Sequence, residues 1–164
     1  MCVRVAAQTV HLYGQRRNEV NMSKIKVVFW TQSGNTETMA NAIVDGIKEG
    51  GKEGEAIFVT DLTPGDLKDD AVFALGCPAM GDEVLEDSDM EPFVEALETM
   101  VSGKNIALFG SYGWGDGQWM RDWVERMAGA GATIVGGEGL MGHETPDEDC
   151  IAECQALGKQ LAAL

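Results

Sequence analysis

Short hydrophobic runs alternate along this chain with longer segments in which hydrophobic positions recur every three or four residues. The runs have the length and the β-branched and aromatic content of buried strands, and they cover residues 24–31, 56–60, 71–77, 105–110 and 132–135. The periodic segments predict amphipathic helices, which begin near Thr36, Pro92, Trp119 and Pro146. Strands that are apolar on both faces are typical of a parallel sheet covered by helices. The pattern therefore predicts an α/β fold, a doubly wound, three-layer domain with a five-stranded parallel sheet.

Composition and charge limit the function classes. The 164 residues suit one domain with a real hydrophobic core. The formal net charge is −15, and since residues 1–22 contribute +2, residues 23–164 carry −17. Nucleic-acid binding is not expected, because neutralising phosphates requires a basic face. No run approaches the roughly 20 apolar residues of a membrane span, so no membrane partner is expected either.

The basic N-terminal segment differs from the rest of the chain. It holds three Arg and one Glu and lacks the apolar core of a secretory signal. We interpret residues 1–22 as a leader, either disordered or translated from a start codon placed upstream of a natural start at Met22. Residues 23–164 form the predicted domain.

The predicted site lies in three loops that follow strands, because ligands of such sheets bind at the carboxyl ends of strands where the strand order switches. The first loop combines hydroxyls, an amide and a glycine directly before a helix, and it reads Thr31, Gln32, Ser33, Gly34, Asn35 and Thr36. Outward-pointing amides and the helix dipole favour a phosphate there. The alternative is an ordinary helix cap by Thr or Asn. A Walker loop is excluded, because its Gly-x-x-x-x-Gly-Lys pattern is absent.

The other two loops offer surfaces for a flat ligand. Trp114 lies among the glycines of the third loop, where stacking on a ring and packing back onto the core are the two alternatives. In the second loop Met80 offers a polarizable face, and Gly81 can adopt positive φ. Glu83 can accept a ring N–H, although Asp82 and Glu83 are also compatible with a solvated acidic turn.

The cysteines and two further motifs say less about the function than the three loops do. The cysteines, Cys2, Cys77, Cys150 and Cys154, form no C-x-x-C pair and are interpreted as reduced thiols. Residues 137–142 match G-x-G-x-x-G but do not join a strand directly to a helix, as a dinucleotide site requires. No G-x-S-x-G nucleophile elbow is present, which argues against a serine hydrolase.

Taken together, the three loops resemble those of one family. The segments TQSGNTETMA (31–40), CPAMGDEVLE (77–86) and ALFGSYGWGDGQWMRDW (107–123) resemble the flavodoxins, specifically the short-chain type of anaerobic bacteria, across essentially residues 23–164. The resemblance implies strand order 2-1-3-4-5 with FMN at the switch point. A receiver-type signalling domain of the same fold is excluded, because its acidic residues after the first and third strands are missing.

The resemblance also implies roles for individual residues. Residues 31–36 would hold the FMN phosphate, with Met80 as the inner stacking residue and Trp114 as the outer one. The Gly81–Asp82 peptide would flip on reduction and Glu83 would bind the pyrimidine N3–H. The remaining expected contacts come from Pro78 and Ala79 in the second loop and from the backbone of Ser111, Tyr112, Gly113, Trp114 and Gly115. Pro78 departs from the small residue usual in the family and lacks an N–H.

The function implied by the resemblance is electron transfer. We expect a cytoplasmic, monomeric, low-potential one-electron carrier that cycles between semiquinone and hydroquinone and is not itself an enzyme. Its partners would be the basic faces of reductases and oxidases served by ferredoxin-type carriers. The candidate docking residues are Asp82, Glu83, Glu86, Asp87 and Asp89. The alternative is a flavodoxin-like FMN-dependent reductase of quinones or NAD(P)H.

Overall fold

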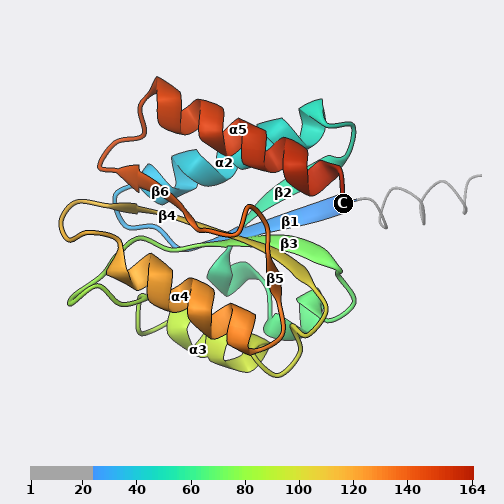
Figure 1. Cartoon of the computed structure of the whole chain (residues 1–164), viewed down its shortest axis with the longest axis horizontal. Helices are drawn as coiled ribbons and strands as arrows, with labels where there is room; N and C mark the ends of the chain where they lie inside the picture. Colours follow the sequence, from blue (N-terminus) through green and yellow to red (C-terminus); the bar gives the residue numbers. More distant parts are fainter. Residues whose placement is uncertain (1–23) are drawn as a thin grey trace, which may run out of the picture.

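The computed structural model describes residues 24–164, and the predicted leader lies outside these residues. A parallel sheet runs through the molecule in the order β2-β1-β3-β4-β5, which confirms the predicted order (Figure 1). Its strands are β1 (Lys24–Phe29), β2 (Glu53–Phe58), β3 (Val72–Gly76), β4 (Asn105–Tyr112), β5 (Thr133–Ile134) and β6 (Leu140–His143).

Helices cover both faces of the sheet, as predicted for three layers. They are α2 (Asn35–Glu49), α3 (Met90–Leu97), α4 (Gln118–Gly129) and α5 (Glu148–Ala162). Helices α2 and α5 lie on one face, and α3 and α4 lie on the other (Figure 1). Two 3₁₀ turns, η1 (Val59–Asp61) and η2 (Pro64–Leu67), lie between β2 and β3. Among residues 24–164, no helix has the length and apolarity needed to cross a membrane.

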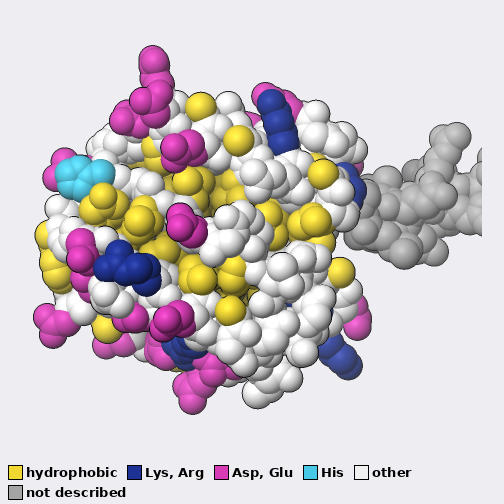
Figure 2. All heavy atoms as spheres, viewed as in Figure 1, with side chains coloured by type: hydrophobic (Ala, Val, Ile, Leu, Met, Phe, Trp, Pro, Cys, Tyr) yellow, Lys and Arg dark blue, Asp and Glu magenta, His cyan; other side chains and the backbone are white. Residues whose placement is uncertain are grey.

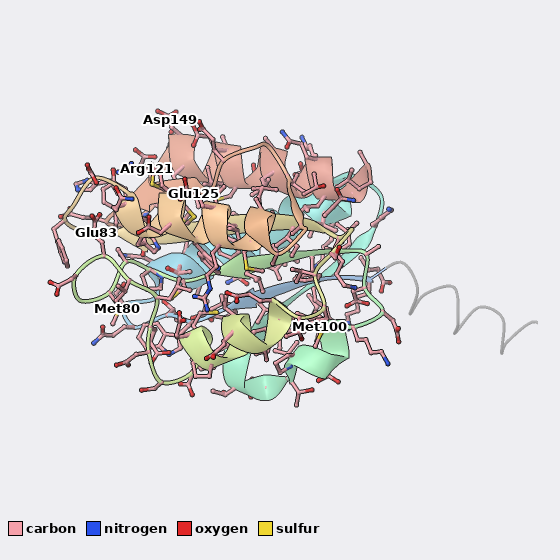
Figure 3. All side chains as sticks on the ribbon, turned by 60° about the horizontal axis from the view of Figure 1, so that its bottom comes forward. Met80, Glu83, Met100, Arg121, Glu125 and Asp149 are labelled. Atoms are coloured by element: carbon pink, nitrogen blue, oxygen red, sulfur yellow. The ribbon has the colours of Figure 1, made fainter. Side chains whose placement is uncertain are left out.

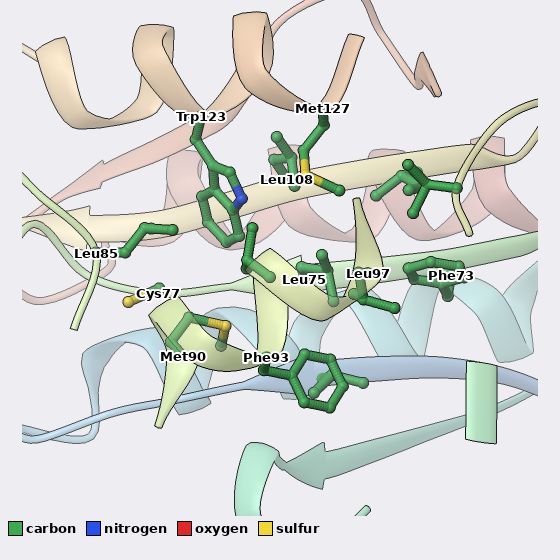
Figure 4. Close-up of a cluster of buried hydrophobic side chains, with 14 of the residues drawn as sticks. Phe73, Leu75, Cys77, Leu85, Met90, Phe93, Leu97, Leu108, Trp123 and Met127 are labelled. Carbon is green, nitrogen blue, oxygen red and sulfur yellow. The ribbon is translucent and has the colours of Figure 1, made fainter. Parts of the chain in front are cut away.

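The core consists of two hydrophobic clusters, one on each side of the sheet. The cluster under α3 and α4 contains Trp123, Phe93 and Leu97 packed on Leu75 and Leu108 (Figure 4). The other cluster fills the space between the sheet, α2 and α5. Burial on both faces explains why the central strands read as uninterrupted hydrophobic runs.

Two glycines bring α2 and α5 into backbone contact. A Cβ atom added at Gly158 would lie 2.1 Å from the carbonyl oxygen of Ile43, and one added at Gly46 would lie 2.0 Å from that of Gln155. Both distances are far below a van der Waals contact. The close approach of these helices therefore depends on the absence of side chains at the two positions.

The fifth strand differs from the prediction. Only Thr133–Ile134 forms β5, and the chain then forms the additional strand β6 (Leu140–His143), which was not predicted. Residues Gly136 and Gly137, at φ of 82° and 79°, turn the chain between the two pieces. β5 pairs with the start of β4, and β6 pairs with its carboxyl half. The prediction missed β6 because its four residues contain no β-branched side chain.

Candidate functional site

The three predicted loops meet at one edge of the sheet. The Trp30 N–H donates to the carbonyl of Gly76 at 3.0 Å, and the Ala79 N–H donates to the carbonyl of Ser111 at 3.0 Å. Figure 3 shows Met80 and Glu83 at the same end of the molecule as Arg121 of α4. The structure thus brings together the loops after β1, β3 and β4.

The first loop forms a cradle of backbone amides. Gly34 is the N-cap of α2 at φ 91°, and no side chain caps this helix. The hydroxyl of Thr31 accepts from the Gly34 N–H at 3.0 Å, and that of Ser33 accepts from the Asn35 N–H at 3.4 Å. Within residues 24–164 the next two amides, of Thr36 and Glu37, have no acceptor. Unsatisfied amides at a helix N-terminus suit an anion, which favours the cradle over the ordinary side-chain cap.

The second loop is a tight hairpin. Met80 and Val84 exchange two backbone hydrogen bonds of 2.9 Å. Gly81 has φ 49°, as expected from the sequence, and Glu83 also has a positive φ of 57°. A cavity of about 630 Å³ lies between this hairpin and the first loop. It is lined by Trp30, Thr31, Gln32, Met80, Gly81, Val84, Leu85, Glu86 and Asp87.

Glu83 joins the second loop to the third. Its Oε1 accepts from the N–H groups of Asp116, Gly117 and Gln118 at 3.1, 3.1 and 3.3 Å, so it caps α4 from 33 to 35 positions away. A Cβ at Gly115 would lie 2.2 Å from this oxygen, so the glycine leaves room for the carboxylate. The sequence analysis missed this contact. The expected bond from Glu83 to a ring N–H stays a prediction.

The third loop presents its aromatic residues in different ways. Trp114 is 55% exposed, so it does not fold back onto the core. Tyr112 packs against Trp119 and His143, with ring centroids 5.7 and 5.0 Å apart. An exposed indole in a glycine-rich loop favours the interpretation of Trp114 as a stacking platform.

Two other predicted site residues offer no backbone donor. Pro78 has no N–H, and the N–H of Ala79 is bonded to Ser111. Just before them, Cys77 is fully buried, and burial raises the pKa of its thiol to about 12. Burial also raises the pKa of Cys150 and Cys154. These three thiols are therefore protonated at neutral pH and are poor nucleophiles.

The assignment of Glu86 to a docking surface is wrong. This residue is only 6% exposed, because its carboxylate turns inward to cap α3. It accepts from the N–H groups of Ser88, Asp89 and Met90 at 2.7, 2.8 and 2.9 Å. Desolvation opposes the ionisation of Glu86, but these amide bonds outweigh it, so the net effect lowers its pKa.

Replacing Glu86 with Gln should therefore change the pH dependence of stability. A lowered pKa in the folded state stabilises the protein above the ordinary pKa of Glu, about 4.3, and this contribution is lost as pH falls through the folded value. We expect Glu86→Gln to cost about 1–2 kcal/mol at pH 7. The cost should shrink below about pH 4, as measured by urea unfolding. Glu95→Gln, exposed on the same helix, is the control, and a pH-independent cost of Glu86→Gln would contradict the assignment.

Comparison with known proteins identifies the family. The family model described as Flavodoxin matches residues 27–158. A flavodoxin of Clostridium beijerinckii is 49% identical over 84% of this chain and 99% of its own length. The chain belongs to the flavodoxin family. A flavodoxin of Megasphaera elsdenii is 43% identical over 84% of the chain and 98% of its own length. The solution structure of two-electron reduced Megasphaera elsdenii flavodoxin covers 85% of the chain and 99% of its own, with a TM-score of 0.76.

Flavodoxins are FMN-binding electron-transfer proteins rather than enzymes, and this chain is a short-chain member. The residues of this structure fit the cofactor. Free amides at the N-terminus of α2 suit a phosphate, while Met80 and the exposed Trp114 offer surfaces to a flat ring. As an electron carrier, this flavodoxin must exchange electrons with redox partners.

Proposed function

We propose that this flavodoxin is a low-potential one-electron carrier of the cytoplasm. The observation that carries the proposal is an anion cradle, Thr31–Thr36, that contains no Lys or Arg and lies in a strongly acidic domain. Bound FMN would supply the redox chemistry, and the protein would tune its energies. The residues around the bound cofactor would set its two reduction potentials.

The three loops would hold separate parts of the cofactor. The amides of residues 31–36 would bind the phosphate, and Met80 and Trp114 would contact the two faces of the ring. The positive φ of Gly81 supports the proposal that the Gly81–Asp82 peptide changes orientation with the redox state, since glycine crosses between backbone regions with little strain.

The negative charge of the domain supports the proposed low reduction potential. Each added electron brings negative charge to the site, and the domain formed by residues 23–164 already carries −17. Acidic side chains greatly outnumber Lys and Arg on the face seen in Figure 2. An electron is harder to add in such surroundings, and each 1.4 kcal/mol of bias corresponds to about 60 mV for one electron.

The same charge supports a mode of partner recognition. We propose that the carrier is a monomer that docks through its acidic surface onto basic faces of reductases and oxidases. Asp82, Asp87 and Asp89 are exposed near the cavity and remain docking candidates, together with the half-buried Glu83. Long-range attraction of this kind speeds association and weakens with salt.

An anaerobic reductive titration followed by visible absorption tests the proposal. Two well-separated one-electron steps, the second at low potential, are the expected result. A single two-electron step together with steady oxidation of NAD(P)H would instead favour the reductase alternative. Failure of the purified protein to take up added FMN would overturn both.

The role of Gly81 can be tested separately. A Cβ at this position meets nothing closer than 3.8 Å, so Gly81→Ala changes backbone freedom and not packing. Positive φ costs a residue with a side chain about 1–2 kcal/mol, and we expect this cost to fall on the state that carries one added electron. The first potential should then fall and the second should rise by about 60 mV each, so the gap between them should narrow by about 120 mV. Gly103→Ala, at φ 81° in open space on a distant turn, should leave both potentials unchanged. An unchanged gap in Gly81→Ala would remove this glycine from the redox response.

A further inference from the structure

A further cavity lies on α4, outside the site that the three loops form. It has a volume of about 370 Å³ and lies between α4 and the segment that connects β5 to β6. Its apolar lining comes from Met120 and Val124 of α4 and from Met141 of β6. None of these residues lines the cavity between the first loop and the hairpin, so the proposed binding of FMN does not account for this one. We refer to it as the methionine groove.

Contacts between methionines and glycines shape the methionine groove. A Cβ atom added at Gly117 would lie 2.6 Å from the Met141 Sδ, and one added at Gly139 would lie 2.1 Å from the Met120 Sδ. Each thioether therefore lies against backbone that carries no side chain. Gly117 is also the N-cap of α4 and donates its N–H to Glu83. The groove thus begins at the end of the third loop.

Large apolar side chains are exposed mainly at this end of the molecule. Among residues 24–164, the large hydrophobic residues that are well exposed are Val84, Trp114, Met141 and Leu164. Val84 belongs to the hairpin, Trp114 to the third loop and Met141 to the wall of the groove. Hydrophobic side chains also gather between α4 and α5 on the face seen in Figure 2. Apolar side chains grouped in this way are typical of a surface that contacts another protein.

The charges around the groove indicate which kind of partner fits. Glu125 of α4 and Glu138 of the connecting segment line the groove and are exposed. Neither forms an ion pair within the described part of the chain. The basic residue of the lining, Arg121, already donates to the carboxylate and to the carbonyl of Asp116, both at 3.0 Å. The rim therefore offers net negative charge, which complements Lys or Arg side chains of a partner.

A second copy of the chain does not complement this charge. Residues 23–164 carry −17, so two such domains repel each other, whereas a basic protein is attracted. Methionine side chains are flexible and polarizable, so a groove lined by them adapts to apolar groups of different shape. An electron carrier that serves several partners gains from such a surface.

We infer that the methionine groove binds an apolar side chain on the basic face of a redox partner, with Glu125 and Glu138 beside the flanking Lys or Arg residues. The inference rests on the proposed docking to basic partners and adds a contact outside the acidic hairpin. Charge attracts the partner, and burial of the apolar side chain fixes its orientation. Binding therefore includes an apolar contribution that salt does not screen.

Two peptides test the inference on the full chain loaded with FMN. One is a pentapeptide with phenylalanine between two pairs of lysines, and the other has glycine at the centre and the same charge. NMR of ¹³C-labelled methionine methyl groups reports on the groove. We expect the phenylalanine peptide to shift the Met120 and Met141 signals saturably and to leave Met100, which lies away from Glu83 in Figure 3, unchanged. It should bind about 10-fold more tightly than the glycine peptide, because it buries an aromatic side chain.

Three variants separate the groove from the rest of the surface. Met141→Gln should weaken binding of the phenylalanine peptide about fivefold and leave binding of the glycine peptide within twofold of wild type, because only apolar burial is lost. Met141→Leu keeps the apolar surface and should bind both peptides like wild type. Leu164→Gln removes a similarly exposed apolar side chain at the C-terminus and should have no effect. FMN affinity and both potentials should stay unchanged in all three variants.

Other outcomes overturn the inference in distinct ways. Equal affinity for the two peptides, or a shift of Met80 without shifts of Met120 and Met141, would leave docking to charge and the hairpin alone. Methionine shifts that depend on protein concentration without peptide would mean that a second copy occupies the groove. Equal losses in Met141→Gln and Leu164→Gln would remove the groove from recognition. If neither peptide binds at low salt, the proposed docking to basic partners also fails, whereas a wild-type chain that does not bind FMN would overturn the carrier function itself.

Discussion

Replacement of Gly158 by alanine will lower the free energy of unfolding by about 3 kcal/mol, near the upper end of the usual cost of overpacking. The added methyl group would lie 2.1 Å from the Ile43 carbonyl oxygen and 2.7 Å from the Ile47 amide nitrogen. These atoms belong to the backbone of α2 and cannot rotate away. Helix α5 would have to move off α2 and open the core between them. Urea unfolding followed by circular dichroism measures the loss.

Gly129 provides the matched control. It lies at the end of α4, and an added Cβ would meet nothing within 4 Å. Alanine is the better helix former by up to about 1 kcal/mol, so Gly129→Ala should leave the stability unchanged or raise it. Equal effects of the two substitutions would show that the contact between α2 and α5 is not rigid.

Substitution of Trp114 by alanine will weaken FMN binding roughly 30-fold and leave the stability of the apoprotein unchanged. The indole is 55% exposed, so the fold gains little from it. Stacking on the flavin would bury an aromatic face, and area burial and ring stacking together contribute about 2 kcal/mol, which corresponds to the 30-fold change. Titration of the apoprotein with FMN, followed by the quenching of flavin fluorescence, gives the affinities.

Two further variants test whether the aromatic ring of Trp114 accounts for the loss of FMN affinity. Trp114→Tyr keeps an aromatic platform and should lose less than fivefold in FMN affinity. Val84→Ala removes exposed apolar atoms from the neighbouring hairpin without touching a ring, and should have less than a threefold effect. Similar losses in Val84→Ala and Trp114→Ala would mean that general apolar burial, and not stacking, holds the cofactor.

Local patterns were enough to predict much of this molecule. Buried strands read as hydrophobic runs, and helices read as periodic segments, because each signal lies within a few neighbouring residues. The topology rule then placed the loops around residues 31, 80 and 114 at one edge, and the structure confirms that edge. Gly81 does adopt the positive φ that its residue type permits.

What sequence could not predict depends on partners that are distant along the chain. In the sequence Glu86 cannot be told apart from the other acidic residues of its loop. Only in the folded loop does its carboxylate accept hydrogen bonds from three backbone amides. The hydroxyls of Thr36 and Ser111 lie within hydrogen-bonding distance although the residues are 75 positions apart, and no local sequence pattern predicts this contact. The strand β6 has weak intrinsic preference and forms because β4 leaves an edge for it to pair with.

The remote cap on α4 has a consequence for the order in which this end of the molecule becomes structured. The N-cap of helix α4 is Gly117, which has no side chain to cap the helix, and the oxygen that binds the first amides belongs to Glu83. The first turn of α4 and the hairpin at residues 80–84 therefore open and close together as one cooperative unit. A fluctuation that frees the hairpin also frays the helix, so motion on the cofactor side of the molecule reaches the surface of α4 without any rearrangement of the core.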